Sequence, residues 1–110
     1  MKIFYLLIAM LTESFVYSQT AEQYFNAWIA KVSIQEHNGA IVDFTKAIDL
    51  EPELAIGYFN RGLSKYYLQD YRGAISDYNK AIELNPKDVT AYVNRGVAMI
   101  ISYIWHKLTA

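Results

Sequence analysis

The sequence contains no cysteine among its 110 residues. This absence excludes disulfide bonds, thiol catalysis, thiolate metal sites and the cysteine anchor of a lipoprotein. A strong charge of one sign is also missing, because ten scattered Lys and Arg residues stand against eleven Asp and Glu, for a net charge of −1. A chain without a basic field has no electrostatic means of attracting nucleic acid. We therefore expect no nucleic-acid partner.

Patterns typical of catalysis and metal binding are absent as well. Neither His37 nor His106 has a histidine or a carboxylate at the helical i, i+4 spacing that would indicate a metal pair. There is no glycine-rich loop of the kind that binds phosphate. Acidic residues such as Asp43 and Asp77 recur at matching positions, which is typical of solvated faces. The sequence predicts a protein that is not an enzyme and holds no cofactor or metal.

The N-terminal segment predicts export. A single lysine precedes an apolar run at residues 3–11, which is too short for a bilayer span of about 20 residues. A polar break and small residues follow, so residues 1–19 are typical of a secretory signal peptide cut near Gln19. The mature chain would be periplasmic or secreted, and it would contact the membrane only through this signal. If the segment is not a signal, we expect a cytoplasmic protein. Two alternatives stay open, a first helix packed on the rest and an uncleaved anchor. An intact mass that retains Met1 after export would contradict cleavage.

What the sequence does contain is an internal repeat. The segment GAIVDFTKAIDLEP at residues 39–52 reappears as GAISDYNKAIELNP at residues 73–86, with nine of fourteen positions identical at an offset of 34. The same offset separates the two prolines and runs through three units at Tyr24, Tyr58, Tyr92, Asn26, Asn60 and Asn94. A fixed period of 34 predicts stacked helical hairpins in place of a single globular core. It favours a function in holding another molecule over catalysis.

Apolar residues at spacings of three and four predict the helices. We expect them at residues 21–34, 37–50, 55–68, 71–84 and 89–105. Breaks are expected after residue 34, at Gln69-Asp70 and before each proline, because the residue preceding proline is pushed out of the α region. The predicted units run over residues 21–54, 55–88 and a partial 89–99 of a repeat domain at 20–99, with an atypical apolar helix end at 100–110.

Small and aromatic residues at repeated positions predict the packing. A glycine inside a helix is less favourable than alanine by roughly 1 kcal/mol, so Gly62 and Gly96 are expected where two helices approach closely. Ala40 and Ala74 are expected at the matching contact of the second helices. We expect the repeated tyrosines to wedge between paired helices, and we expect two further aromatics to seal one hairpin against the next, namely Phe44 and Tyr78.

The chain resembles the tetratricopeptide repeat (TPR) family over roughly residues 21–99. The resemblance is carried by AIGYFNRGLSKYYLQDYRGAISDYNKAIELNP (55–86), HNGAIVDFTKAIDLEP (37–52) and AYVNRGVAM (91–99). It implies an all-α, right-handed α-solenoid of about two and a half helix-turn-helix repeats with a concave groove. It also implies a scaffold that binds proteins or peptides. One departure is Trp28 in place of the glycine found at Gly62, which predicts an atypical first hairpin.

By this resemblance the groove is lined by residues of the first helix of each unit. The candidate groove residues are Phe25, Ile29, Phe59, Asn60, Leu63, Tyr66, Tyr67, Val93 and Val97. None is charged, so the groove would suit an apolar or aromatic partner segment. Several of these side chains could instead pack on neighbouring helices, and both roles stay open. A clamp for carboxylate tails, which some members have, is not expected because its cations are missing and only Asn60 falls on a matching position.

The repeat pattern ends after Met99. The following segment, IISYIWHKLTA, is apolar where a closing helix should be polar outside. Two alternatives to the binding scaffold follow: a structural piece that forms a homodimer through this face, and the front part of a longer repeat array. The candidate self-association residues are Met99, Ile100, Tyr103, Ile104 and Trp105.

Overall fold

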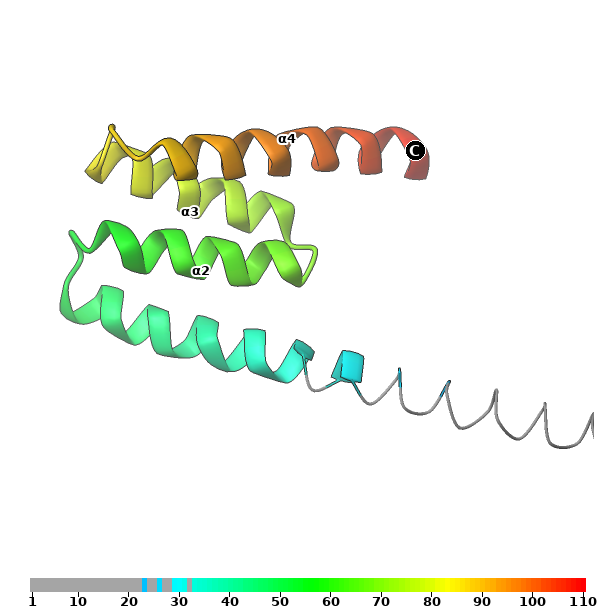
Figure 1. Ribbon diagram of the computed structural model, residues 1–110, viewed down its shortest axis with the longest axis horizontal. Helices are drawn as coiled ribbons and strands as arrows, with labels where there is room; N and C mark the ends of the chain where they lie inside the picture. The colour runs from blue at the N-terminus through cyan, green and yellow to red at the C-terminus, as the bar shows by residue number, and fades with distance from the viewer. Residues whose placement is uncertain (1–22, 24–25, 27–28, 32) are drawn as a thin grey trace, which may run out of the picture. The chain divides into compact units, whose positions relative to one another are not determined.

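The computed structural model describes residues 23, 26, 29–31 and 33–110 (Figure 1). The chain divides into two compact units, Met1–Ser33 and Ile34–Ala110, and the described residues of the first unit are helical. The second unit contains the helical residues 34–50, then α2 (Ala55–Tyr67), α3 (Tyr71–Leu84) and α4 (Val89–Thr109). The predicted export signal, Phe25 and Trp28 lie outside the described residues, so the predictions about them remain predictions.

The helices of the second unit pack in the order of the sequence (Figure 1). Helix 33–50 contacts α2, where the ring of His37 stacks on that of Tyr67 at 5.1 Å between centroids. Next along the stack, α2 packs on α3 and α3 packs on α4. The predicted all-α fold of consecutive packed helices is confirmed.

The hairpin of α2 and α3 follows from its turn residues. Gln69 takes a positive φ of 66°, which reverses the chain after α2. The carboxylate of Asp70 then accepts a hydrogen bond from the backbone N–H of Gly73 at 3.0 Å and caps the start of α3. Such a cap satisfies one of the backbone N–H groups that have no partner inside the helix. The break predicted at Gln69-Asp70 is therefore confirmed.

The break predicted after residue 34 is wrong. Residues 33–50 are helical without interruption, so no turn separates a helix at 21–34 from one at 37–50. The repeat offset explains the difference, because Glu36 stands where Asp70 caps α3. Glutamate is not among the preferred capping residues, and it is a good helix former. Continuing the helix is therefore more favourable at this point than turning.

The core is small and lies between α2, α3 and α4. Its buried cluster contains Ala74, Tyr78 and Ala98, and Phe59 and Tyr66 pack against it. The alanines let the helices approach closely enough for the fully buried ring of Tyr78 to fill the space between them. The predicted roles of Ala74 and Tyr78 in helix packing agree with this cluster.

Gly62 and Gly96 have different surroundings although they share a repeat position. A Cβ atom on Gly62 would lie 2.9 Å from the Tyr78 ring, so the predicted close approach is present there. A Cβ atom on Gly96 would meet nothing within 4 Å, and Tyr92, one turn earlier, is 41% exposed. The close contact expected at Gly96 and the wedged position expected for Tyr92 are wrong, because no described helix packs on this face of α4.

Within the described part of the chain, none of the helices combines the length and the apolar character needed to cross a membrane.

Candidate functional site

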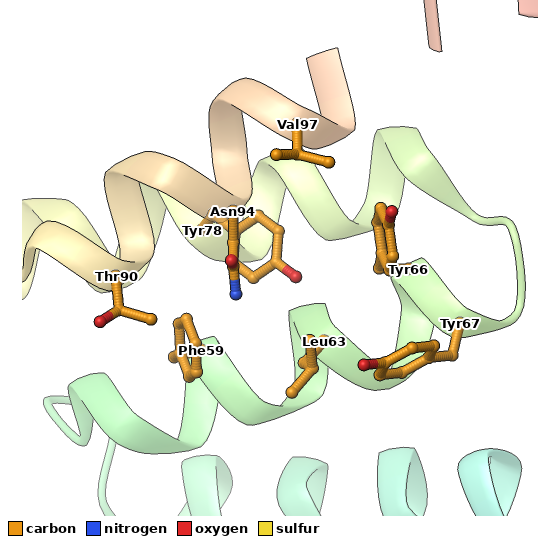
Figure 2. A pocket seen from close by; sticks show the side chains of 8 residues that line it. All are labelled: Phe59, Leu63, Tyr66, Tyr67, Tyr78, Thr90, Asn94 and Val97. Atoms are coloured by element: carbon orange, nitrogen blue, oxygen red, sulfur yellow. The ribbon is translucent and has the colours of Figure 1, made fainter. Parts of the chain in front are cut away.

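A hollow of about 420 Å³ opens between α2 and α4, with α3 behind it (Figure 2). Eight residues line it, namely Phe59, Leu63, Tyr66, Tyr67, Tyr78, Thr90, Asn94 and Val97. The α2 residues follow one another at spacings of four, three and one, and the α4 residues at four and three, so each set lies on one side of its helix. None of the eight is charged. The hollow can therefore accept apolar groups and offers a few neutral hydrogen-bonding groups.

Tyr78 supplies an unusual polar group at the floor of this hollow. Its side chain is fully buried, and its hydroxyl has no hydrogen-bond partner among the described residues. Burial disfavours the phenolate, with smaller contributions from Tyr66, Tyr67 and Asp77, and raises the pKa of Tyr78 to about 12. A buried hydroxyl without a partner is destabilising. A carbonyl oxygen would have to enter beside the buried ring to supply the missing acceptor.

Aromatic rings hold the α2 side of the hollow in place. Tyr66 meets Tyr67 edge to face at 5.6 Å and Tyr71 at 5.5 Å, and the ring of Phe59 lies 5.7 Å from that of Tyr78. Edge-to-face pairs of this kind contribute about 0.5–1.5 kcal/mol beyond the area that they bury. The wall of the hollow is therefore largely formed before any partner arrives.

An ion pair fixes α2 against α3. The guanidinium of Arg61 donates to both carboxylate oxygens of Asp77 at 2.9 and 2.7 Å, and the ammonium of Lys65 lies 3.0 Å from the same carboxylate. These hydrogen bonds to Asp77 raise the pKa of Arg61 above its ordinary value. A two-pronged contact sets orientation as well as distance. It thus sets how α2 presents its side of the hollow.

The structure brings together about half of the predicted groove residues. Five of them line the hollow, namely Phe59, Leu63, Tyr66, Tyr67 and Val97. Ile29, Asn60 and Val93 are not among the lining residues, and Phe25 lies outside the described part. Phe59 and Tyr66 both line the hollow and pack on the core, so the two roles left open by the sequence coexist. That these residues bind a partner remains a prediction.

Three lining residues were not predicted to line a groove. Thr90 and Asn94 precede Val97 by seven and three positions, so the helical spacing alone would have placed them on the same side of α4. Tyr78 comes from α3, the second helix of its pair, where the sequence predicts only a packing role. Its position at the floor depends on how three helices meet, which no local pattern reveals.

The candidate self-association residues are exposed on α4. The exposed fraction of the residue lies between 46% and 65% at Met99, Ile100, Tyr103, Ile104 and Trp105. An apolar face of this kind is a typical place for contact with another molecule. The exposure agrees with the prediction of an apolar helix end, while pairing through this face stays a prediction.

The helical fold agrees with the comparison to known protein families. Residues 62–100 match the family model described as a TPR repeat. The chain contains a TPR repeat. The matched segment runs from the middle of α2 through α3 into α4, and it includes every residue of the hollow except Phe59. No curated protein matches the sequence.

A TPR repeat has a general functional meaning. Segments of this kind are generally non-catalytic and suggest a scaffold for contacts between proteins. No group of three or more His, Asp or Glu side chains suited to a metal ion occurs in the described residues.

Proposed function

We propose that the protein is a non-catalytic interaction scaffold that binds an apolar segment of a protein or peptide in the hollow between α2 and α4. The observation that carries this proposal is the uncharged lining with the unpartnered hydroxyl of Tyr78 at its floor. Apolar side chains of the partner would be buried against Phe59, Leu63 and Val97. A small side-chain movement that uncovers the buried hydroxyl of Tyr78 would let one backbone carbonyl of the partner accept its hydrogen bond.

The amide of Asn94 adds a second polar contact. An amide side chain both donates and accepts hydrogen bonds, so Asn94 can pair with the backbone of a partner whatever its sequence. Tyr67 at the edge is 59% exposed and can cover an incoming aromatic ring. The partner would be recognised by its apolar side chains and by its main chain, without ion pairs.

A peptide selection would test the proposal. A random displayed peptide library is panned on the wild-type chain, and the binding of enriched peptides is then measured by titration. We expect peptides rich in Leu, Phe, Tyr or Trp. Val97→Asp should weaken their binding at least tenfold, which is about 1.4 kcal/mol, because a carboxylate in an apolar hollow is desolvated by the partner.

The matched control is Val93→Asp. Val93 lies one turn earlier on the same helix and is also exposed, but it does not line the hollow. Its substitution should leave peptide affinity unchanged. The proposal is wrong if no peptide is enriched, or if Val97→Asp and Val93→Asp affect the binding equally.

A further inference from the structure

Among the described residues no helix packs on one face of α4, and this face repeats the face that α2 turns toward α3. Arg61 and Gly62 of α2 are matched 34 residues later by Arg95 and Gly96 of α4. Arg61 donates through Nη1 to Thr45 at 3.3 Å, and Arg95 donates through Nη1 to Asn79 at 2.9 Å, again 34 residues on. The two arginines thus stand in the same relation to the preceding helix.

Arg61 and Arg95 differ in the hydrogen bonds that their Nε and Nη2 groups make. Nε and Nη2 of Arg61 grip Asp77, whereas in the described residues no hydrogen bond from Nε or Nη2 of Arg95 occurs. Beside Arg61, Gly62 receives the Tyr78 ring, while the space beside Gly96 is empty. Beyond them Met99 and Tyr103, 46% and 65% exposed, continue the same side of α4. We call this side the α4 face (Tyr92, Arg95, Gly96, Met99 and Tyr103). It resembles the surface of α2 on which α3 packs, so a helix like α3 could pack there.

Helix 33–50 carries the matching surface. Asp77 and Tyr78 of α3 contact α2, and Ala74 and Ala81, which lie on the same side of α3, are buried with them. Their equivalents 34 residues earlier form the donor face of helix 33–50, namely Ala40, Asp43, Phe44 and Ala47. Asp43 is exposed, the other three are only half-buried, and in the described residues no salt bridge engages Asp43. The donor face therefore has the chemistry of α3 without the burial.

The two faces cannot meet within one molecule. Helix 33–50 and α4 are the outer helices of the second unit, with α2 and α3 between them (Figure 1). We propose that the α4 face of one copy binds the donor face of a second copy, so that the guanidinium of Arg95 grips the carboxylate of Asp43 and the ring of Phe44 covers Gly96. The contact joins different surfaces, so it is heterologous and continues from copy to copy.

Charge complementarity supports a second copy as the occupant. The α4 face presents one cation and the donor face one anion at the positions that make the Arg61–Asp77 pair inside each molecule. The donor segment is identical to that of α3 at nine of fourteen positions. This contact uses none of the residues of the hollow, so it is independent of the proposed peptide binding.

Light scattering on the full chain and two single variants tests the contact. Gly96→Leu adds a large side chain in the space beside Gly96 and so blocks the α4 face. Asp43→Arg puts a cation on the donor face, where it would repel Arg95 of the other copy. Both positions are open in the single molecule, so neither variant should lose helicity in circular dichroism. The wild type should form species whose mass grows with protein concentration, whereas each variant alone should remain a monomer.

Mixing separates this contact from every other mode of association. An equimolar mixture of the two variants retains one intact α4 face and one intact donor face, so it should form dimers and nothing larger. The double variant Asp43→Arg/Arg95→Asp should recover the growing species, because the charges are complementary again. A monomeric wild type, a monomeric mixture, or a dimer of Asp43→Arg alone through α4 pairing with α4 would each overturn the proposal.

Discussion

At the scale of single residues, residues at equivalent repeat positions make different contacts. Gly62 and Gly96 occupy the same place in successive units, yet only Gly62 touches the next helix. The absence of a side chain is required where the ring of Tyr78 approaches α2. On α4 the same absence leaves Gly96 half-buried, and a Cβ atom there would meet nothing within 4 Å.

Alanine substitution at the two glycines should therefore have opposite effects. Gly62→Ala should lower the free energy of unfolding by about 1–3 kcal/mol, because its Cβ would lie 2.9 Å from the Tyr78 ring and 3.1 Å from Cβ of Asp77. Gly96→Ala should raise it by up to about 1 kcal/mol through helix propensity. Urea denaturation followed by circular dichroism, at low protein concentration, measures both. Equal effects of the two substitutions would contradict the assigned contacts.

Tyr78 should make the stability depend on pH at the alkaline end. Its folded pKa of about 12 exceeds the ordinary value of 10.0, so its contribution is complete below pH 10 and is lost as the pH rises toward 12. The wild type should lose up to roughly 2–3 kcal/mol more than Tyr78→Phe over this window. Urea midpoints at several pH values measure the difference. In the absorbance of tyrosinate, Tyr78→Phe should have one tyrosine fewer than the wild type that ionises only near pH 12. Parallel pH profiles of the two proteins would contradict this prediction.

At the scale of elements, a single capping residue separates a turn from a continuous helix. Asp70 ends the turn after α2 by capping α3, while Glu36 at the equivalent position lies inside helix 33–50. The apolar spacing on both sides of the two positions is similar, so periodicity alone predicts a break at both. The capping chemistry decides between them, since the short carboxylate of aspartate reaches the backbone N–H two or three residues on.

Removing this cap should weaken α3. Asp70→Ala should lower the free energy of unfolding by about 1 kcal/mol, because the backbone N–H of Gly73 loses its acceptor. Asp70→Asn should be nearly neutral, since an asparagine side chain caps equally well. Thermal and urea unfolding curves of the three proteins provide the comparison. If Asp70→Asn lowers the free energy of unfolding as much as Asp70→Ala does, the charge of Asp70 and not its capping hydrogen bond stabilises α3.

At the scale of the whole molecule, the stack is held by contacts between neighbouring helices. Helix 33–50 packs on α2, α2 on α3 and α3 on α4, so the outer faces have no partner among the described residues of the second unit. In repeat structures each unit depends on its neighbours for much of its stability. The exposed faces of helix 33–50 and α4 are therefore the places where a further copy would add most to stability.

The sequence by itself determined the period, the ranges of α2 and α3, and the start of α4, because apolar spacing, prolines and Asp caps are local signals. It also indicated all four α2 residues that line the hollow. Only the tertiary structure decided that Tyr78 forms the floor, that Thr90 and Asn94 complete the wall, and that Gly96 faces open space. These properties depend on how close separate helices come to one another, which is set by side chains distant in the sequence and not by the residue itself.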